Sequence, residues 1–233
     1  MNSPAPVRID VDLLTREVVS PRVVLLRFRA RSPLGWHPGQ HLTLFPGEGS
    51  EGIPYSIASA DDPQRPGEFE LAVSAEASAE MLSRLTLADR VQVSLPSGEF
   101  VWRPHARGSL FIGMGTGMAP LRAMLQAARR HPSSNRATLL VGVRALEDVI
   151  GYGELAAWAA ENKAFRFEPT LSEAASNWSG RRGRVQAHLA EVARQAAGSA
   201  VYVCGNRSMV SECVALLTNE LGFAGELVFS EAH

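Results

Sequence analysis

Cysteine, lysine and long apolar runs are all scarce in this sequence of 233 residues. The two cysteines, Cys204 and Cys213, are too few for a disulfide framework or a four-cysteine iron–sulfur site. No apolar run approaches the roughly 20 residues that a membrane-spanning helix needs, and the first residues lack the apolar stretch of a secretion signal. We therefore expect a cytoplasmic protein with free thiols, no membrane association and no metal site.

An excess of charge of either sign is also absent. Against 24 acidic residues stand 23 basic ones, of which only Lys163 is a lysine, and the formal net charge is −1. The arginines are scattered along the chain, so nothing favours a nucleic acid as a partner. Hydrophobic residues make up 45% and charged residues 20% of the chain, a composition that can bury ordinary globular cores.

The N-terminal half has the period of β-strands. Apolar and polar residues alternate in segments such as 7–13 and 69–73, and turn clusters such as 46–49 separate these segments. One stretch, 79–85, has apolar residues at helical spacing instead. The pattern predicts a six-stranded antiparallel β-barrel over residues 1–104.

After residue 104 the pattern changes to short apolar runs, each followed by a helical stretch. The run SLFIGMG precedes MAPLRAMLQAARR, for example, and AVYVCGN precedes SMVSECVALLTNEL. Parallel strands need such crossover connections, so this alternation predicts an α/β domain with a parallel sheet over residues 105–233, after a short linker at 103–108. Ligands of such sheets bind at the carboxyl ends of the strands.

A glycine-rich loop lies between the first of these strands and its helix. It contains Gly113, Gly115, Thr116 and Gly117, with Pro120 in the first helical turn. Glycines let the backbone approach a pyrophosphate, and a helix N-terminus offers it free N–H groups. No Gly-Lys-Ser or Gly-Lys-Thr follows, so nucleoside triphosphate hydrolysis is not expected. Taken alone, the loop is equally compatible with a tight strand-to-helix turn.

Five motifs in order give the chain a resemblance to the ferredoxin–NADP reductase superfamily, whose members pair a flavin-binding barrel with a nucleotide-binding domain. The motifs are the glycine loop and the segments Trp36-His37-Pro38-Gly39-Gln40, Pro54-Tyr55-Ser56-Ile57-Ala58-Ser59, Leu95-Pro96-Ser97-Gly98-Glu99-Phe100 and Cys204-Gly205-Asn206-Arg207-Ser208-Met209. Together they cover nearly the whole chain. The resemblance implies a flavin-dependent NAD(P)H oxidoreductase.

Within this resemblance the barrel segment binds the flavin. Tyr55 would lie against the flavin ring and Ser56 near the flavin N5 atom, where the hydride arrives. Ile57, Ser59 and Ser78 are the other candidates for flavin contacts. These residues are equally compatible with ordinary positions in a strand and a helix start.

One departure from the family pattern concerns the flavin phosphates. The family usually has an arginine two residues before the tyrosine, where this chain has Ile53. An uncharged side chain cannot make the bidentate phosphate contact of a guanidinium. Either other groups, such as Arg65, Arg84 or the start of the predicted helix, hold the phosphates, or the flavin, FAD or FMN, is weakly held. We expect weak retention of the flavin.

The resemblance also assigns residues to the nicotinamide site. Cys204, with Gly205 and Met209 behind it, would line the place of hydride transfer. Glu231 resembles the terminal acidic residue of the family, and His233 stands where an aromatic residue is expected. A proton relay and ring stacking are one interpretation of this pair, and a frayed, solvated tail is the other.

The residues after the third strand of the second domain bear on the choice of nucleotide. Ser172 and Glu173 lie there, and an acidic residue can accept from a 2′-hydroxyl and repel a 2′-phosphate. Arg144 and Arg181 are candidates for the opposite role of pairing with a phosphate. On balance the sequence favours NADH over NADPH.

Three functions remain open at this stage. The first is an electron-transfer reductase serving a separate ferredoxin or oxygenase component. The second is a reductase of free flavins, which the missing arginine at Ile53 favours. The third is a non-catalytic, nucleotide-binding subunit that keeps the fold for contact with a partner.

Overall fold

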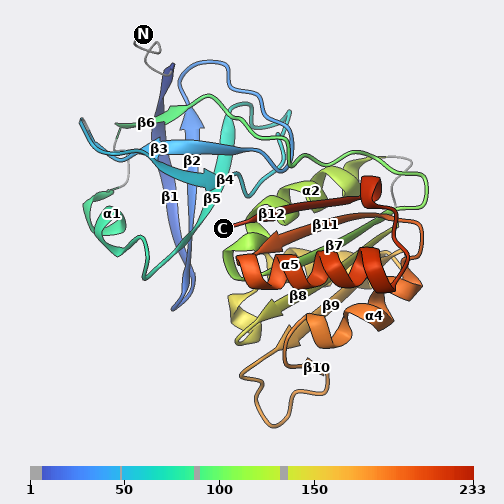
Figure 1. The fold of residues 1–233 in the computed structure, drawn as a ribbon. Helices are drawn as coiled ribbons and strands as arrows, with labels where there is room; N and C mark the ends of the chain where they lie inside the picture. The colour runs from blue at the N-terminus through green and yellow to red at the C-terminus, as the bar shows by residue number, and fades with distance from the viewer. Residues whose placement is uncertain (1–6, 48, 87–89, 132–135) are drawn as a thin grey trace.

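The strands of the protein form two six-stranded sheets, one from each half of the chain (Figure 1). The computed structural model describes residues 7–47, 49–86, 90–131 and 136–233. Within these residues the N-terminal sheet is antiparallel throughout and the C-terminal sheet is parallel throughout. The predicted fold class is therefore confirmed. The proposed division at residue 104 falls in the connection between the two sheets.

The N-terminal sheet is closed into a barrel by its two edge strands. Its strands are β1 (Arg8–Ser20), β2 (Val23–Ala30), β3 (His41–Phe45), β4 (Ile53–Ser56), β5 (Glu68–Ser74) and β6 (Arg90–Ser94), in the order β4-β3-β6-β1-β2-β5. A bridge between Ile57 and Leu71 joins the end of β4 to β5, and the Ala58 N–H donates to the Glu70 carbonyl at 2.7 Å. The predicted helix is present as α1 (Ala79–Arg84) and covers one end of the barrel (Figure 1).

The C-terminal sheet carries helices on both faces. Its strands are β7 (Ser109–Met114), β8 (Ala137–Val143), β9 (Phe165–Leu171), β10 (Arg181–Arg182), β11 (Ala200–Gly205) and β12 (Val228–Ala232), in the order β10-β9-β8-β7-β11-β12. Its helices are α2 (Met118–Arg130), α3 (Tyr152–Glu161), α4 (Gln186–Gln195) and α5 (Arg207–Ala215). Side chains of α2 and α3 pack on one face of the sheet, and those of α4 and α5 on the other. None of the helices among the described residues is long and apolar enough to cross a membrane.

The C-terminal segment is ordered by aromatic packing. Strand β12 pairs with β11 in parallel, with Cys204 opposite Glu231. Phe229 stacks on Tyr202 at a ring separation of 5.2 Å, and Tyr202 stacks in turn on Phe111 at 5.4 Å. The frayed tail considered from the sequence is therefore not what the structure has. Apolar periodicity did not predict β12, because none of the five residues of this edge strand is buried.

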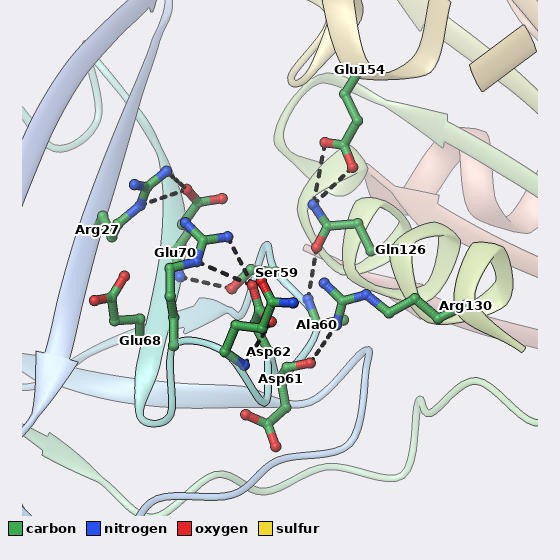
Figure 2. Close-up of polar contacts among 12 residues, drawn as sticks. Arg27, Ser59, Ala60, Asp61, Asp62, Glu68, Glu70, Gln126, Arg130 and Glu154 are labelled. Atoms are coloured by element: carbon green, nitrogen blue, oxygen red, sulfur yellow. Dashed lines mark hydrogen bonds and ion pairs between the residues drawn. The ribbon is translucent and has the colours of Figure 1, made fainter. Parts of the chain in front are cut away.

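A buried cluster of charges joins the two sheets through helix α2 (Figure 2). The Glu70 carboxylate of β5 accepts from Arg27 of β2 at 2.7 Å and from Arg122 of α2 at 2.6 Å. Arg122 also donates to Glu154 of α3 at 3.1 Å. Both Glu70 and Arg122 are buried. A buried pair of this kind is costly to break, because each remaining charge would lose its partner in a poorly solvated place.

Helix α2 also binds the backbone of the segment that follows β4. Arg122 donates to the Ala58 carbonyl at 2.8 Å, and Gln126 accepts from the Ala60 N–H at 2.9 Å. Arg130 donates to the Asp61 carbonyl at 2.5 Å, as Figure 2 shows. Three successive turns of one helix thus hold the barrel segment 58–61 in register with the second sheet.

We expect Glu70→Gln to lower the free energy of unfolding by about 3 kcal/mol, the lower end of the range for breaking a buried ion pair. Burial alone would raise the pKa of Glu70, but Arg122 and Arg27 outweigh burial and hold the pKa below its ordinary value. Because the folded pKa is the lower one, this stabilisation is present above the ordinary glutamate pKa and is lost as the pH falls through the folded value.

Denaturant unfolding across an acidic pH series measures both effects. The wild-type protein should lose stability on acidification more steeply than Glu70→Gln. The control is Glu161→Gln, which breaks the exposed pair of Glu161 with Arg129 and should change nothing resolvable. Equal stability of Glu70→Gln and wild type at neutral pH would contradict the role given to this cluster.

Candidate active site

The glycine loop forms the turn between β7 and α2. Gly115–Gly117 make a single 3-10 turn, and Gly115 has a φ of +54°, a left-handed conformation that favours glycine. A Cβ added at Gly117 would lie 2.5 Å from the Cys204 carbonyl oxygen, and one at Gly113 would lie 2.8 Å from a methyl group of Leu121. The glycines therefore let α2 and β11 approach each other closely. Thr116 lies in the turn, and Pro120 lies buried in the first turn of α2.

A cavity of about 540 Å³ opens beside this loop at the carboxyl ends of the parallel strands. The second sheet contributes the lining residues Met114, Gly115, Gly142, Val143, Arg144, Asp148, Ser172, Gly183, Arg184, Val185, Gln186, Asn206, Ser208 and Met209. The barrel contributes Arg22 and Val23 from the turn between β1 and β2. The cavity is thus built by both halves of the chain, where ligands of open parallel sheets bind.

Helix α5 begins at the edge of the cavity with a side-chain cap. The Asn206 side chain accepts from the Met209 N–H at 2.9 Å, which satisfies one of the free N–H groups of the helix start. Met209 is buried and lines the cavity. A Cβ at Gly205 would lie 2.5 Å from the end of the Met209 side chain and 2.7 Å from Met114, so a larger residue there would displace the two methionine side chains.

Charged side chains of alternating sign surround the mouth of the cavity. Arg22 lies 3.1 Å from Asp148 and 3.6 Å from Glu173, and Arg144 lies 3.7 Å from Glu173. Asp148 is buried and also accepts from the Ala145 N–H at 3.2 Å. Glu173 is more exposed and lies between the two guanidinium groups. Its carboxylate therefore competes with any anionic ligand for both arginines.

Of the neighbouring arginines, Arg184 lines the cavity and Arg181 does not. Arg181 pairs with Glu168 at 3.0 Å and with Glu191 at 2.7 Å, and these contacts engage its guanidinium away from the cavity. Sequence reasoning missed Arg184, as it missed Arg22 and Asp148. The signal for Arg184 was the glycine before it: Gly183 has a φ of +90° and turns the chain after β10.

Cys204, Glu231 and His233 meet at the ends of β11 and β12. The Cys204 sulfur lies 3.2 Å from Nε2 of His233, and that nitrogen lies 3.9 Å from a Glu231 carboxylate oxygen. Burial raises the pKa of the Cys204 thiol well above its ordinary value, and the Glu231 charge adds to the effect. The thiol is therefore protonated at neutral pH, which suits packing beside a ligand and does not suit nucleophilic attack.

The predicted flavin segment lies at the end of β4. The Tyr55 hydroxyl is 2.9 Å from the Ser78 hydroxyl, so the strand and the start of α1 are held together. Burial raises the pKa of Tyr55, and the hydrogen bond with Ser78 partly offsets this. Ser56 is buried and pairs with His41 of β3, and Ile57 belongs to the barrel core.

Ser59 takes part in the junction between the sheets. Its hydroxyl accepts from the Glu70 N–H at 2.9 Å, and its carbonyl accepts from the indole of Trp36 at 2.8 Å. Ser59 therefore lies where the barrel meets α2, close to Glu70 and Ala60 (Figure 2). Of the residues that the structure describes, those lining the large cavity include none from 55–59.

The predicted flavin segment offers groups that suit a flavin ring and, at residue 53, none that suits its phosphates. The Tyr55 hydroxyl lies 2.9 Å from the Ser78 hydroxyl, and Ser56 follows Tyr55 at the end of β4. At the position of the family arginine, Ile53 is half-buried and packs against the barrel core. Its side chain offers a phosphate neither a charge nor a hydrogen-bond donor.

Comparison with known proteins gives relatives in sequence and in fold. The family model of the oxidoreductase NAD-binding domain matches residues 111–215. A ferredoxin–NADP reductase B from Sorangium cellulosum is 39% identical over 189 residues, which are 77% of this chain and 77% of the relative. The ferredoxin–NAD(P)+ reductase component of a naphthalene 1,2-dioxygenase system from Pseudomonas putida is 26% identical over 211 residues. That match covers 89% of this chain but only 63% of the relative.

Solved structures share the whole two-sheet fold. A ferredoxin NADP+ reductase from Neisseria gonorrhoeae, with bound FAD and NADP, has a TM-score of 0.80 at 20% identity and covers 97% of this chain and 98% of that one. An Amycolatopsis cytochrome P450 reductase has a TM-score of 0.82 at 24% identity and covers 97% of this chain and 69% of that one. At these identities the likeness concerns the fold.

The packing of the glycine loop can be tested by two substitutions that should change the stability of the protein in opposite directions. We expect Gly117→Ala to destabilise the protein by about 1–3 kcal/mol, because the added methyl group meets the backbone of β11. In the control Gly153→Ala, the methyl group enters open space on helix α3 and should stabilise the protein by about 0.5–1 kcal/mol. Thermal unfolding of both variants measures the difference, and equal melting temperatures would contradict the packing described for the loop.

Proposed function

Because the chain belongs to the ferredoxin–NADP reductase superfamily, we propose that it is a flavin-dependent NAD(P)H reductase that passes electrons to a ferredoxin or oxygenase component. The observation that carries the proposal is the cavity beside the glycine loop, to which both halves of the chain contribute. Two relatives are named as reductase components of dioxygenase systems and a third as the electron transfer component of an anthranilate 1,2-dioxygenase, and the chain spans 63–64% of their length. The partner is therefore proposed from the kind of partner that these relatives are named for.

The residues of the chain have separable tasks in this function. Tyr55, Ser56 and Ser78 hold the flavin at the barrel, and the glycine loop receives the pyrophosphate of NAD(P)H at the start of α2. When bound, the flavin supplies a ring that accepts a hydride and releases electrons singly or in pairs. The protein contributes orientation and the exclusion of water, since hydride transfer needs no strong base. Protonated Cys204 contributes a small apolar wall beside this place.

A second function, the reduction of free flavins, is supported by Ile53. The barrel offers no guanidinium at this position, so the flavin phosphates lose a contact that would be worth more than an ordinary hydrogen bond. A weakly held flavin exchanges with the solution and then behaves as a substrate. The two functions share the nucleotide site and differ in how long the flavin stays.

Anaerobic spectroscopy after dialysis distinguishes these functions. A yellow protein whose bound flavin is bleached by NADH, and which then reduces ferricyanide, supports the reductase. A colourless protein that oxidises NADH only with added FAD or FMN supports the free-flavin function. We expect Ser56→Ala to slow bleaching by about tenfold or more, the scale of about 1.4 kcal/mol in the barrier. The exposed Ser83→Ala should leave the rate unchanged. A protein that neither binds flavin nor oxidises NADH or NADPH would refute both functions and leave a non-catalytic subunit.

For the nucleotide we propose a preference for NADH. Glu173 lies beside Ser172 of the cavity wall, and its carboxylate holds Arg22 and Arg144, the two guanidinium groups nearest to it. A 2′-phosphate arriving there would have to displace this carboxylate, whereas a 2′-hydroxyl would not. Arg184, which also lines the cavity, carries a positive charge that would attract a 2′-phosphate.

Reversing the charge at this position should reverse the preference. We expect Glu173→Arg to raise the ratio of kcat/KM for NADPH to kcat/KM for NADH by about tenfold, or about 1.4 kcal/mol. The control is Glu220→Arg, the same change at an exposed position at the end of the helical segment Leu216–Glu220. Steady-state kinetics with both nucleotides give the ratio. A wild-type protein with much higher efficiency on NADPH would contradict the proposed preference.

A further inference from the structure

Three side chains at the edge of the parallel sheet form a ligand set suited to a metal ion. One sulfur, one carboxylate oxygen and one imidazole nitrogen, from Cys204, Glu231 and His233, all lie within 4.8 Å of one another. Zn²⁺ binds these three atom types at distances of about 2.0–2.3 Å. Tetrahedral geometry at these bond lengths requires the ligand atoms to be about 3.3–3.6 Å apart.

The measured separations are close to this requirement. The Cys204 sulfur and the His233 nitrogen are 3.2 Å apart, and that nitrogen is 3.9 Å from the Glu231 oxygen. The Cys204 sulfur and the ligand oxygen of Glu231 lie within 4.8 Å of each other. Adjustment of the side chains of residues 231 and 233 would bring all three ligand atoms onto one ion.

The backbone that carries the three ligands is held on both sides. Cys204 pairs with Gly113 of β7 on one side and with Glu231 of β12 on the other. The His233 N–H donates to the Gly205 carbonyl at 3.0 Å and continues the pairing past the end of β12. Residues two apart on an extended chain point to the same face, so Glu231 and His233 are presented together. The site is therefore formed before an ion arrives, which lowers the cost of binding.

Access to the cluster differs from ligand to ligand. Cys204 is fully buried, while the side chains of Glu231 and His233 are 24% and 42% exposed. An ion can enter from the side of the two exposed ligands and reach the sulfur behind them. The fourth position of a tetrahedral ion would then face solvent and hold water.

We propose that Cys204, Glu231 and His233 bind one Zn²⁺ ion. On binding, the Cys204 thiol loses its proton to the buffer, a sulfur–zinc bond forms, and the hydrogen bond between Cys204 and His233 is replaced by ligation to the common ion. The mixture of thiolate, imidazole and carboxylate selects Zn²⁺ against Mg²⁺ or Ca²⁺, which prefer sites made of oxygen atoms alone.

The site has a consequence for activity that rests on the proposed function. Cys204 borders the place where the nicotinamide is proposed to meet the flavin, so a zinc ion and its water would occupy the approach. Zn²⁺ should then inhibit NAD(P)H oxidation reversibly, and a chelator should restore the rate. This consequence fails if the chain is no reductase, whereas binding of the ion does not depend on the function.

Equilibrium dialysis of the purified, flavin-saturated protein against micromolar ZnCl₂, followed by metal analysis, tests binding directly. We expect about one zinc per chain in the wild type and in Cys213→Ser, whose sulfur is buried against Met209 on α5. Loss of a neighbour that only supports a ligand weakens zinc binding by about 10–100-fold, so loss of a ligand in Cys204→Ser or His233→Ala should exceed this range. Glu231→Gln should also weaken binding.

Two further measurements make the result decisive. With Co²⁺ in place of Zn²⁺, a thiolate-to-cobalt charge-transfer band should appear in the difference spectrum of the wild type and be missing from Cys204→Ser. Because Cys204 is buried, its replacement carries the risk of misfolding, and the more exposed His233→Ala provides an independent test. Unchanged zinc stoichiometry in His233→Ala, or equal binding of Mg²⁺, would overturn the site. Absence of NAD(P)H oxidation without zinc would refute the proposed function and leave the dialysis result valid.

Discussion

The ion pair between Arg122 and Glu70 is the contact on which the arrangement of the two sheets depends. Helix α2 begins at the glycine loop, and about one turn later it inserts Arg122 between the barrel and α3. The same guanidinium holds the Ala58 carbonyl, three residues after Tyr55. The glycine loop, proposed to bind the nucleotide, and the end of β4, proposed to bind the flavin, are therefore positioned by one helix. Breaking the pair would leave charges buried without partners, so the two halves are held in one relative orientation.

The same junction explains where the cavity lies. The turn between β1 and β2 brings Arg22 to Asp148 at 3.1 Å, a second ion pair between barrel and sheet. Arg22 and Val23 then complete the wall of the cavity opposite Gly115. The surroundings of the ligand site are thus products of contacts between distant parts of the chain. A barrel held in another orientation would leave the carboxyl ends of the strands as an open surface.

The fold and the glycine loop could be predicted from the sequence, because both produce local patterns of residue types. Each pattern can be read within about a dozen residues: the alternation of apolar and polar residues in a strand, an apolar run followed by a helical stretch, and glycines between a strand and a helix. Arg22 and Asp148 were missed, since they meet at the cavity from positions 126 residues apart along the chain. Arg184 had only a local signal, the preceding Gly183. Strand β12 was left open for a related reason: Phe229 is ordered by stacking on Tyr202, a contact that periodicity does not show.

A stack of three aromatic rings positions the C-terminal strand. Phe111, Tyr202 and Phe229 belong to three neighbouring strands, and the Tyr202 hydroxyl is bound by the Arg103 backbone of the connection from the barrel. The stack fixes β12 at Phe229, which is two residues before Glu231 and four before His233. Because Cys204 lies two residues after Tyr202 on the adjacent strand, the same stack sets the distance between the thiol and the imidazole. The arrangement of Cys204, Glu231 and His233, on which both the proposed hydride site and the proposed zinc site depend, is therefore set by the register of β11 against β12.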